Sequence, residues 1–147
     1  MNRPKALRRA NFRIADSAQQ VVGGFLLAGP FVVTEEVWVL ATGMNAIQAV
    51  LTAGVVAAIG YAGLYRADTG RDPDAERAVV GIPVRFLSLM VVSFGSVLLL
   101  ALLLDAPETF LIDQGMTGNT VWITTAKAIT VGAVFSVVGA ATADSVF

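Results

Sequence analysis

The sequence predicts an all-α, polytopic membrane protein in which the whole chain, residues 1–147, forms one domain with four transmembrane helices. Hydrophobic residues make up 56% of the chain and charged residues only 14%, whereas a soluble protein surface carries roughly 25–35% charged residues. Four apolar segments each approach the ~20 residues needed to cross a bilayer. The basic residues gather in segments on one side of these spans, which is typical of multi-pass membrane proteins.

The first element is a basic N-terminal segment that leads into an apolar one. Residues 1–20 contain five arginine or lysine residues. The spacing of Leu7, Ala10 and Ile14 fits either a short interfacial helix or a frayed basic tail. The apolar stretch that follows is too long for a cleaved signal peptide. We therefore expect the first span to cover residues 20–42.

Three further spans and two loops complete the predicted topology. We expect spans at residues 45–65, 80–104 and 119–143, a cytoplasmic loop at 66–79 and an outer loop at 105–118. Asn45 is placed to cap the second helix. Small residues recur along two spans, which indicates close helix packing or, alternatively, a hydrated pathway. They are Ala49, Ala53, Ala57 and Gly60 in the second span, and Thr120, Thr124, Ala128, Gly132, Ser136 and Ala140 in the fourth.

The charge distribution predicts the orientation. Nine of the ten basic residues lie before the first span or in and beside residues 66–79, and the outer loop has three acids and no base. Because basic residues favour the cytoplasmic side, we expect both termini in the cytoplasm and the chain in the cell (inner or cytoplasmic) membrane, surrounded by the lipid bilayer.

The residue types narrow the possible chemistry. The chain has no cysteine and no histidine, which removes disulfides, thiolate nucleophiles and the commonest general base. We expect no enzyme activity, no catalytic residue, no cofactor and no nucleic-acid partner. The sequence leaves open whether a metal ion binds.

Three ionisable residues, Glu35, Glu36 and Lys127, fall at membrane depth, where charges are costly and mark functional sites. Arg85 also lies in a predicted span, but near its start. At 1.5 Å per residue, Glu35 lies about 9 Å below Ala41, near the outer end of the first span, and Lys127 lies about 12 Å below Asn119, at the outer end of the fourth. A glutamate–Lys127 ion pair is therefore geometrically allowed. Such a pair would serve ion or proton transport, or it would only fix the register of two helices.

Pro30 lies in the same span and removes the backbone donor to the Leu26 carbonyl. It predicts either a tolerated kink, or a helix broken near Gly29 and Pro30 with carbonyls free to face a cation. Trp38 and Trp122 are expected to anchor their helices at the outer membrane–water interface.

Residues 23–41, GGFLLAGPFVVTEEVWVLA, resemble a family of small integral membrane proteins of unknown function. The family's first-span signature, Pro followed by Thr-x-Glu-x-Trp, corresponds here to Pro30, Thr34, Glu36 and Trp38. The resemblance implies a multi-span protein without assigned activity, and it favours Glu36 as the family's acid. Helical phase favours Glu35 instead, because that residue shares a stripe with small residues of the first span.

Two functions remain open from the sequence. In the first, a homo-oligomeric channel or transporter subunit passes a small cation or proton, with Glu36, Glu35 and Thr34 as ion-binding candidates and Lys127 as counter-charge. In the second, the chain is a non-transporting membrane scaffold or accessory subunit with a structural Glu–Lys pair. A membrane enzyme is disfavoured, because no nucleophile–base pair is recognisable.

Overall fold

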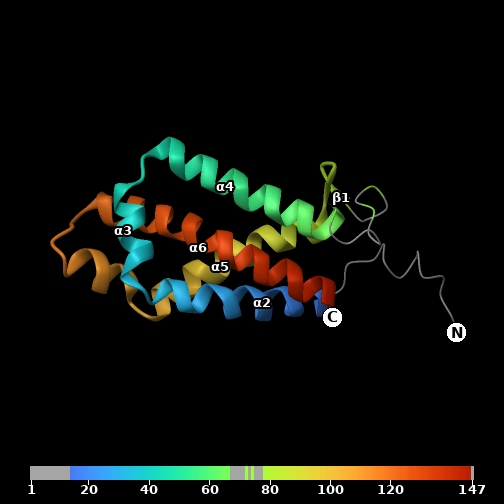
Figure 1. Cartoon of the computed structure of the whole chain (residues 1–147), viewed down its shortest axis with the longest axis horizontal. Coiled ribbons are helices and arrows are strands. Elements are labelled where there is room, and N and C mark those ends of the chain that lie inside the picture. Colours follow the sequence, from blue (N-terminus) through green and yellow to red (C-terminus); the bar gives the residue numbers. More distant parts are fainter. Residues whose placement is uncertain (1–13, 67–71, 73, 75–77, 147) are drawn as a thin grey trace, which may run out of the picture.

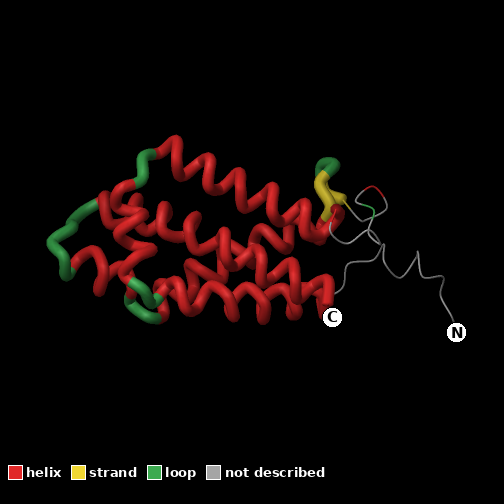
Figure 2. Tube along the Cα trace, in the orientation of Figure 1, coloured by secondary structure: helices red, strands yellow, loops and turns green. Residues whose placement is uncertain are grey.

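The computed structural model describes residues 14–66, 72, 74 and 78–146, which form a helical bundle (Figures 1 and 2). The basic N-terminal segment and most of the predicted cytoplasmic loop lie outside these residues. Within the described residues, three helices are long and apolar enough to cross a membrane, or four if one bent pair counts as a single span. The all-α prediction is confirmed apart from one short hairpin.

The predicted first span is two helices, not one. Helix α2 covers Ile14–Val32 and α3 covers Glu35–Gly43, with a bend of 81° between them. The break lies at Val33 and Thr34, after Pro30 and not at it. Pro30 withholds one backbone hydrogen bond from the last turn of α2, and Thr34 then takes an extended conformation before α3 begins. Because 19 residues rise about 28 Å, α2 alone almost spans a hydrocarbon core.

The second predicted span corresponds to helix α4, Ala46–Tyr61, which continues as a π-helical turn, η1, Ala62–Arg66. Asn45 caps α4 as expected, through a reciprocal capping box. Its Oδ1 accepts from the Gln48 N–H at 2.8 Å, and Gln48 Oε1 accepts from the Asn45 N–H at 2.9 Å. Two backbone donors at the start of α4 are therefore satisfied.

The third predicted span begins later than expected. Strands β1, Ala78–Val79, and β2, Ile82–Pro83, form a two-stranded antiparallel hairpin. Helix α5, Val84–Leu103, starts directly after it. A short π-helical segment, η3, Glu108–Ile112, occupies the predicted outer loop, and α6, Asn119–Val146, closes the chain.

Helix α6 is the centre of the bundle, because it contacts α2, α3, α4 and α5. In Figure 1, α2 and α5 run beside α6, α3 crosses one end of the bundle, and α4 diverges from α6 toward that end. The predicted small-residue stripe of α6 is buried from Thr124 to Ala140, whereas Thr120 is exposed. This burial favours close packing over a hydrated pathway.

The tightest helix contact joins α2 to α6 at Gly23 and Gly139. A Cβ atom at either glycine would overlap the backbone carbonyl oxygen of the other. Toward the α3 end, the rings of Phe31 and Phe135 stack across the same pair of helices with centroids 3.7 Å apart. Small residues at one level and aromatic rings at the other therefore set the path of α2 along α6.

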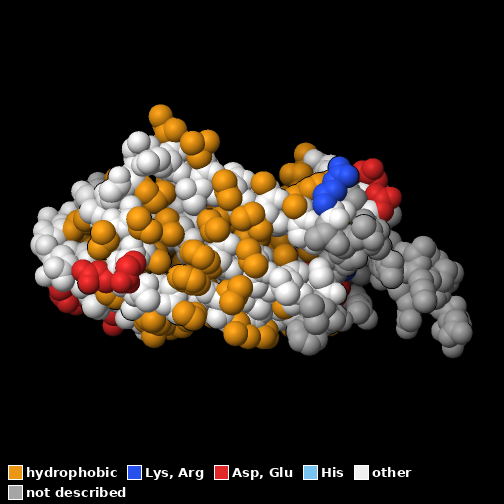
Figure 3. Space-filling view, in the orientation of Figure 1, with side chains coloured by type: hydrophobic (Ala, Val, Ile, Leu, Met, Phe, Trp, Pro, Cys, Tyr) orange, Lys and Arg blue, Asp and Glu red, His pale blue; other side chains and the backbone are white. Residues whose placement is uncertain are grey.

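Basic side chains are visible at one end of the bundle only. On the face shown in Figure 3, Lys and Arg side chains lie near the hairpin, with acidic side chains beside them, whereas the end that carries α3 and η3 shows acidic side chains alone. The first residues of α2 and the last residues of α6 also lie at the hairpin end (Figure 1).

The close approach of Gly23 and Gly139 yields a stability prediction. Gly23→Ala should lower the melting temperature in detergent by several degrees, because overpacking of a tight contact costs about 1–3 kcal/mol. The matched control is Gly54→Ala on α4, where an added Cβ meets nothing within 4 Å. Equal melting temperatures for the two variants would contradict the α2–α6 packing.

Candidate functional site

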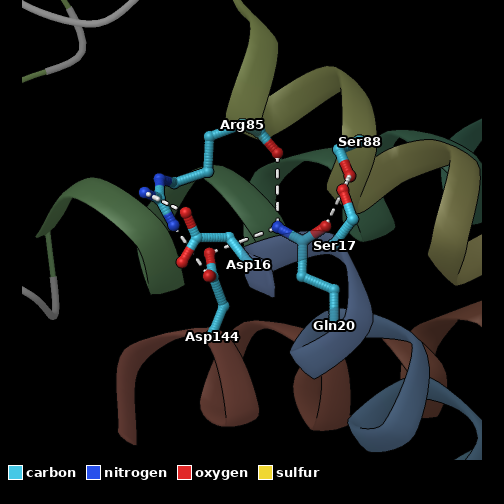
Figure 4. A network of polar contacts seen from close by, with 6 residues as sticks. All are labelled: Asp16, Ser17, Gln20, Arg85, Ser88 and Asp144. Carbon is cyan, nitrogen blue, oxygen red and sulfur yellow. Dashed lines mark hydrogen bonds and ion pairs between the residues drawn. The ribbon is translucent and has the colours of Figure 1, made fainter. Parts of the chain in front are cut away.

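A buried cluster of ionisable side chains joins α2, α5 and α6 at the hairpin end of the bundle (Figure 4). Arg85, in the first turn of α5, donates from Nη1 to Asp144 Oδ1 at 2.7 Å and from Nη2 to Asp16 Oδ2 at 3.3 Å. The side chains of Arg85, Asp16 and Asp144 are only 5%, 10% and 0% exposed. One guanidinium thus bridges carboxylates from the first and last described helices.

Amide and hydroxyl groups extend this cluster (Figure 4). Gln20 Nε2 donates to Asp144 Oδ2 at 3.2 Å and to the Arg85 carbonyl at 3.5 Å. Ser88 Oγ donates to Gln20 Oε1 at 2.7 Å and lies 3.1 Å from Ser17 Oγ. Each of the three helices therefore supplies at least one polar group to a single connected network, which we call the inner cluster.

Helix polarity explains why these residues need one another. Arg85 lies at the positive end of the α5 dipole and Asp144 in the last turn of α6, at its negative end. Each charge is therefore unfavourable for its own helix. The ion pair between them offsets both effects, and Asp16 is additionally favoured by its place in the first turn of α2. The geometry is that of a helix clamp in which two carboxylates share one guanidinium.

The sequence reasoning missed Asp16 and Asp144, because the predicted spans at 20–42 and 119–143 placed both residues just outside the membrane. The sequence accounted for Arg85 only as one of the basic residues beside the predicted cytoplasmic loop. One sequence signal could have found Asp144: it is the next position, four residues after Ala140, in the small-residue stripe of the last helix. Asp16 and Gln20 share the same spacing on α2.

The structure does not form the expected glutamate–Lys127 pair. Lys127 Nζ donates to the carbonyl of Met44, just after α3, at 2.7 Å. Among the described residues, no ion pair within 4.0 Å joins Lys127 to Glu35 or Glu36. The depth estimate assumed a helix that continues straight to Ala41, whereas the 81° bend turns α3 away from that path.

The three charged residues instead stabilise the two ends of α3. Glu35 and Glu36 are exposed in its first turn, where acids are favourable for the helix dipole. Lys127 contributes the opposite charge beside the last turn of α3. The glutamates thus lie at an exposed helix start and not inside the bundle.

Thr34 and Trp38 close the break between α2 and α3. Thr34 Oγ1 donates to the Phe31 carbonyl at 2.9 Å, and Trp38 Nε1 donates to the Val32 carbonyl at 3.0 Å. Two carbonyls that the end of α2 leaves without helical partners are thereby satisfied. We predicted that carbonyls near Pro30 could face a cation, but those at the observed break already accept hydrogen bonds within the chain.

The two tryptophans differ in their surroundings. Trp38 is 2% exposed and stacks on Phe110 with centroids 5.9 Å apart. Its indole belongs to the packed core, which corrects its expected role as an interface anchor. Trp122 is 62% exposed near the start of α6, so its anchoring role stays a prediction.

The described residues contain no group of three or more Asp, Glu, Cys or His side chains placed to hold a metal ion. Within the same residues, Gln19 Oε1 is the one buried side-chain polar atom without a hydrogen-bond partner. The polar groups of the interior are therefore used almost entirely in contacts within the chain.

Comparison with protein-family models, curated proteins and solved structures finds no match for this chain. The resemblance to the family of small integral membrane proteins stays a prediction.

The inner cluster yields a second stability prediction. Arg85→Met should destabilise the bundle by about 3–5 kcal/mol, because it leaves buried carboxylates without their guanidinium. Adding Asp144→Asn should recover part of this loss. Thermal unfolding in detergent measures both effects, with Arg66→Met at the exposed end of η1 as the control. A loss no larger than that of the control would refute the clamp.

A double-mutant cycle tests the partner of Lys127. Lys127→Met should cost about 1–3 kcal/mol through the lost charged hydrogen bond to Met44. The effects of Glu36→Gln and Lys127→Met on the free energy of unfolding should be additive, with a coupling energy below about 0.5 kcal/mol, because the two side chains share no contact. If Lys127→Met instead restored the stability that Glu36→Gln loses, the glutamate–Lys127 ion pair expected from the sequence would be the correct interpretation.

Proposed function

We propose that this chain is a multi-pass protein of the cell membrane that acts as a non-transporting scaffold or accessory subunit. The observation that carries this proposal is the inner cluster, in which Arg85 ties Asp16 and Asp144 together across three helices. A charge placed to bind a transported ion needs an accessible face. These charges are instead buried against one another, which is the arrangement of a structural clamp.

The polar groups at the α3 end support the same proposal. Three side chains donate hydrogen bonds to backbone carbonyls of the same chain: Lys127 to Met44, Thr34 to Phe31 and Trp38 to Val32. Each of these bonds fixes the position of α3 relative to α2 or α6. These polar residues therefore fix the positions of the helices relative to one another. A scaffold needs such a fixed shape in order to present a constant surface to its partners.

The placement of the described arginines supports the expected orientation. Arg66 and Arg85 lie at the hairpin end, although Asp16 and Asp144 lie there too. The opposite end carries Glu35, Glu36, the acids around η3 and one base, Lys127. The orientation rule counts basic residues and not net charge. We propose that the hairpin end faces the cytoplasm. Since α2 begins and α6 ends there, both termini are then cytoplasmic.

The alternative function is a cation or proton channel or transporter subunit. One observation favours it: Glu35 and Glu36 line a shallow surface hollow of about 410 Å³ with Val39 and Leu40. A homo-oligomer that brought these hollows together would surround a shared pathway with carboxylates. In that case the ion-binding residues would be Glu36, Glu35 and Thr34, at the outer end of the pathway.

Reconstitution in liposomes separates the two functions. The scaffold proposal predicts that vesicles containing the full chain pass protons, Na⁺ and K⁺ no faster than empty vesicles, as followed with pH- and cation-sensitive dyes. Glu36→Gln should leave that baseline unchanged. A flux above the baseline that Glu36→Gln abolishes would overturn the scaffold proposal in favour of the transport function.

A further inference from the structure

Two adjoining hollows lie where α5 ends, η3 turns and α6 begins. The smaller, of about 180 Å³, is lined by acidic, aromatic and apolar side chains. Its lining includes Asp105, Glu108 and Trp122 together with Leu102, Ile112 and Val121. The larger, of about 460 Å³, shares Ile112, Val121 and Trp122 with it. Trp122, which is 62% exposed, is therefore one of three residues that line both hollows.

Two acidic residues, Asp105 and Glu108, line the smaller hollow. Asp105 adopts a left-handed conformation with φ +52°, which turns the chain out of α5, and aspartate tolerates this region better than most residues. The Asp105 carbonyl then accepts from the Thr109 N–H at 2.9 Å, and the Glu108 carbonyl from the Asp113 N–H at 2.9 Å. Both acids are exposed and remain available to a ligand.

From this arrangement we infer that the hollow beside Trp122 binds the ammonium headgroup of a membrane lipid. An indole face attracts an ammonium ion through its quadrupole, and two carboxylates add complementary charge. The small volume suits a headgroup and not an acyl chain. The inference rests on the membrane location within the proposed function, but it does not depend on whether the protein transports anything.

The surroundings of the hollow favour a lipid over a free amine. Leu102 and Leu103 near the end of α5 are 46% and 68% exposed, and Ile123 on α6 is 55% exposed. These side chains continue the apolar surface of the crossing helices up to the rim. An acyl chain lying along that surface would bring its headgroup to the level of Trp122, where indoles favour the membrane–water interface.

Native mass spectrometry of the full chain in mild detergent tests the inference. With equal amounts of phosphatidylethanolamine and phosphatidylglycerol, the chain should retain the ethanolamine lipid about fivefold more, because the cation–π contact and the ion pair each contribute a small factor. Trp122→Leu, and separately Asp105→Asn with Glu108→Gln, should each lower the preference to about twofold, and the three substitutions together should abolish it.

The matched control is Glu35→Gln with Glu36→Gln, which removes two acids from the same end but outside the hollow. This control should keep the lipid preference. No preference in the unmodified chain, or an equal loss in the control, would overturn the inference. If glycerophosphoethanolamine without acyl chains bound as tightly, the ligand would be a soluble amine and the lipid assignment would be wrong.

Incorporation of the unmodified chain into lipid nanodiscs distinguishes this failure from that of the proposed function. A chain that enters the bilayer without preferring the ethanolamine headgroup contradicts only the headgroup site. A chain that does not enter the bilayer contradicts the membrane location itself.

Discussion

A guanidinium buried among apolar helices has to be matched by carboxylates, and this requirement organises the hairpin end of the molecule. Arg85 contacts Asp16 from α2 and Asp144 from α6, so residues 128 positions apart along the chain are held at one point. The helix dipoles alone would disfavour Arg85 and Asp144 where they stand. Their pairing brings these ends of the three helices together, and the small-residue contact between Gly23 and Gly139 joins α2 to α6 in the same alignment.

The opposite end is organised by backbone acceptors. Here the chain turns through 81° between α2 and α3, and such a break exposes carbonyls that lipid cannot satisfy. Thr34, Trp38 and Lys127 supply the missing donors. Polar groups inside the bundle are therefore satisfied differently at its two ends. Charged side chains pair with one another at the hairpin end, whereas side-chain donors bind backbone carbonyls at the α3 end.

Much of the fold could be predicted from hydropathy and from single residues. The apolar runs located α4, α5 and α6 within a few residues, and Asn45 marked the start of α4 because a capping residue acts locally. The position of the bend, at Val33 and Thr34, could not be predicted from the sequence, because Pro30 weakens the helix but does not determine the residue at which it ends. The partners of Lys127 and Arg85 depend on which helix faces meet. The estimate of depth along a straight first span therefore suggested a glutamate as the partner of Lys127. It gave no partner for Arg85.

The unequal lengths of the helices bear on the bilayer that this protein fits. Helix α5 rises about 30 Å, close to an ordinary hydrocarbon thickness, whereas α6 rises about 42 Å. The excess of about 12 Å matches the thickness of one further helix, and α3 crosses one end of the bundle in contact with α6 (Figure 1). In the proposed membrane location, α3, with Val39 and Leu40 exposed, would form an interfacial shelf above the crossing helices. Hydrophobic mismatch in a thinner or thicker membrane would then act first on this shelf and spare the clamp at the opposite end.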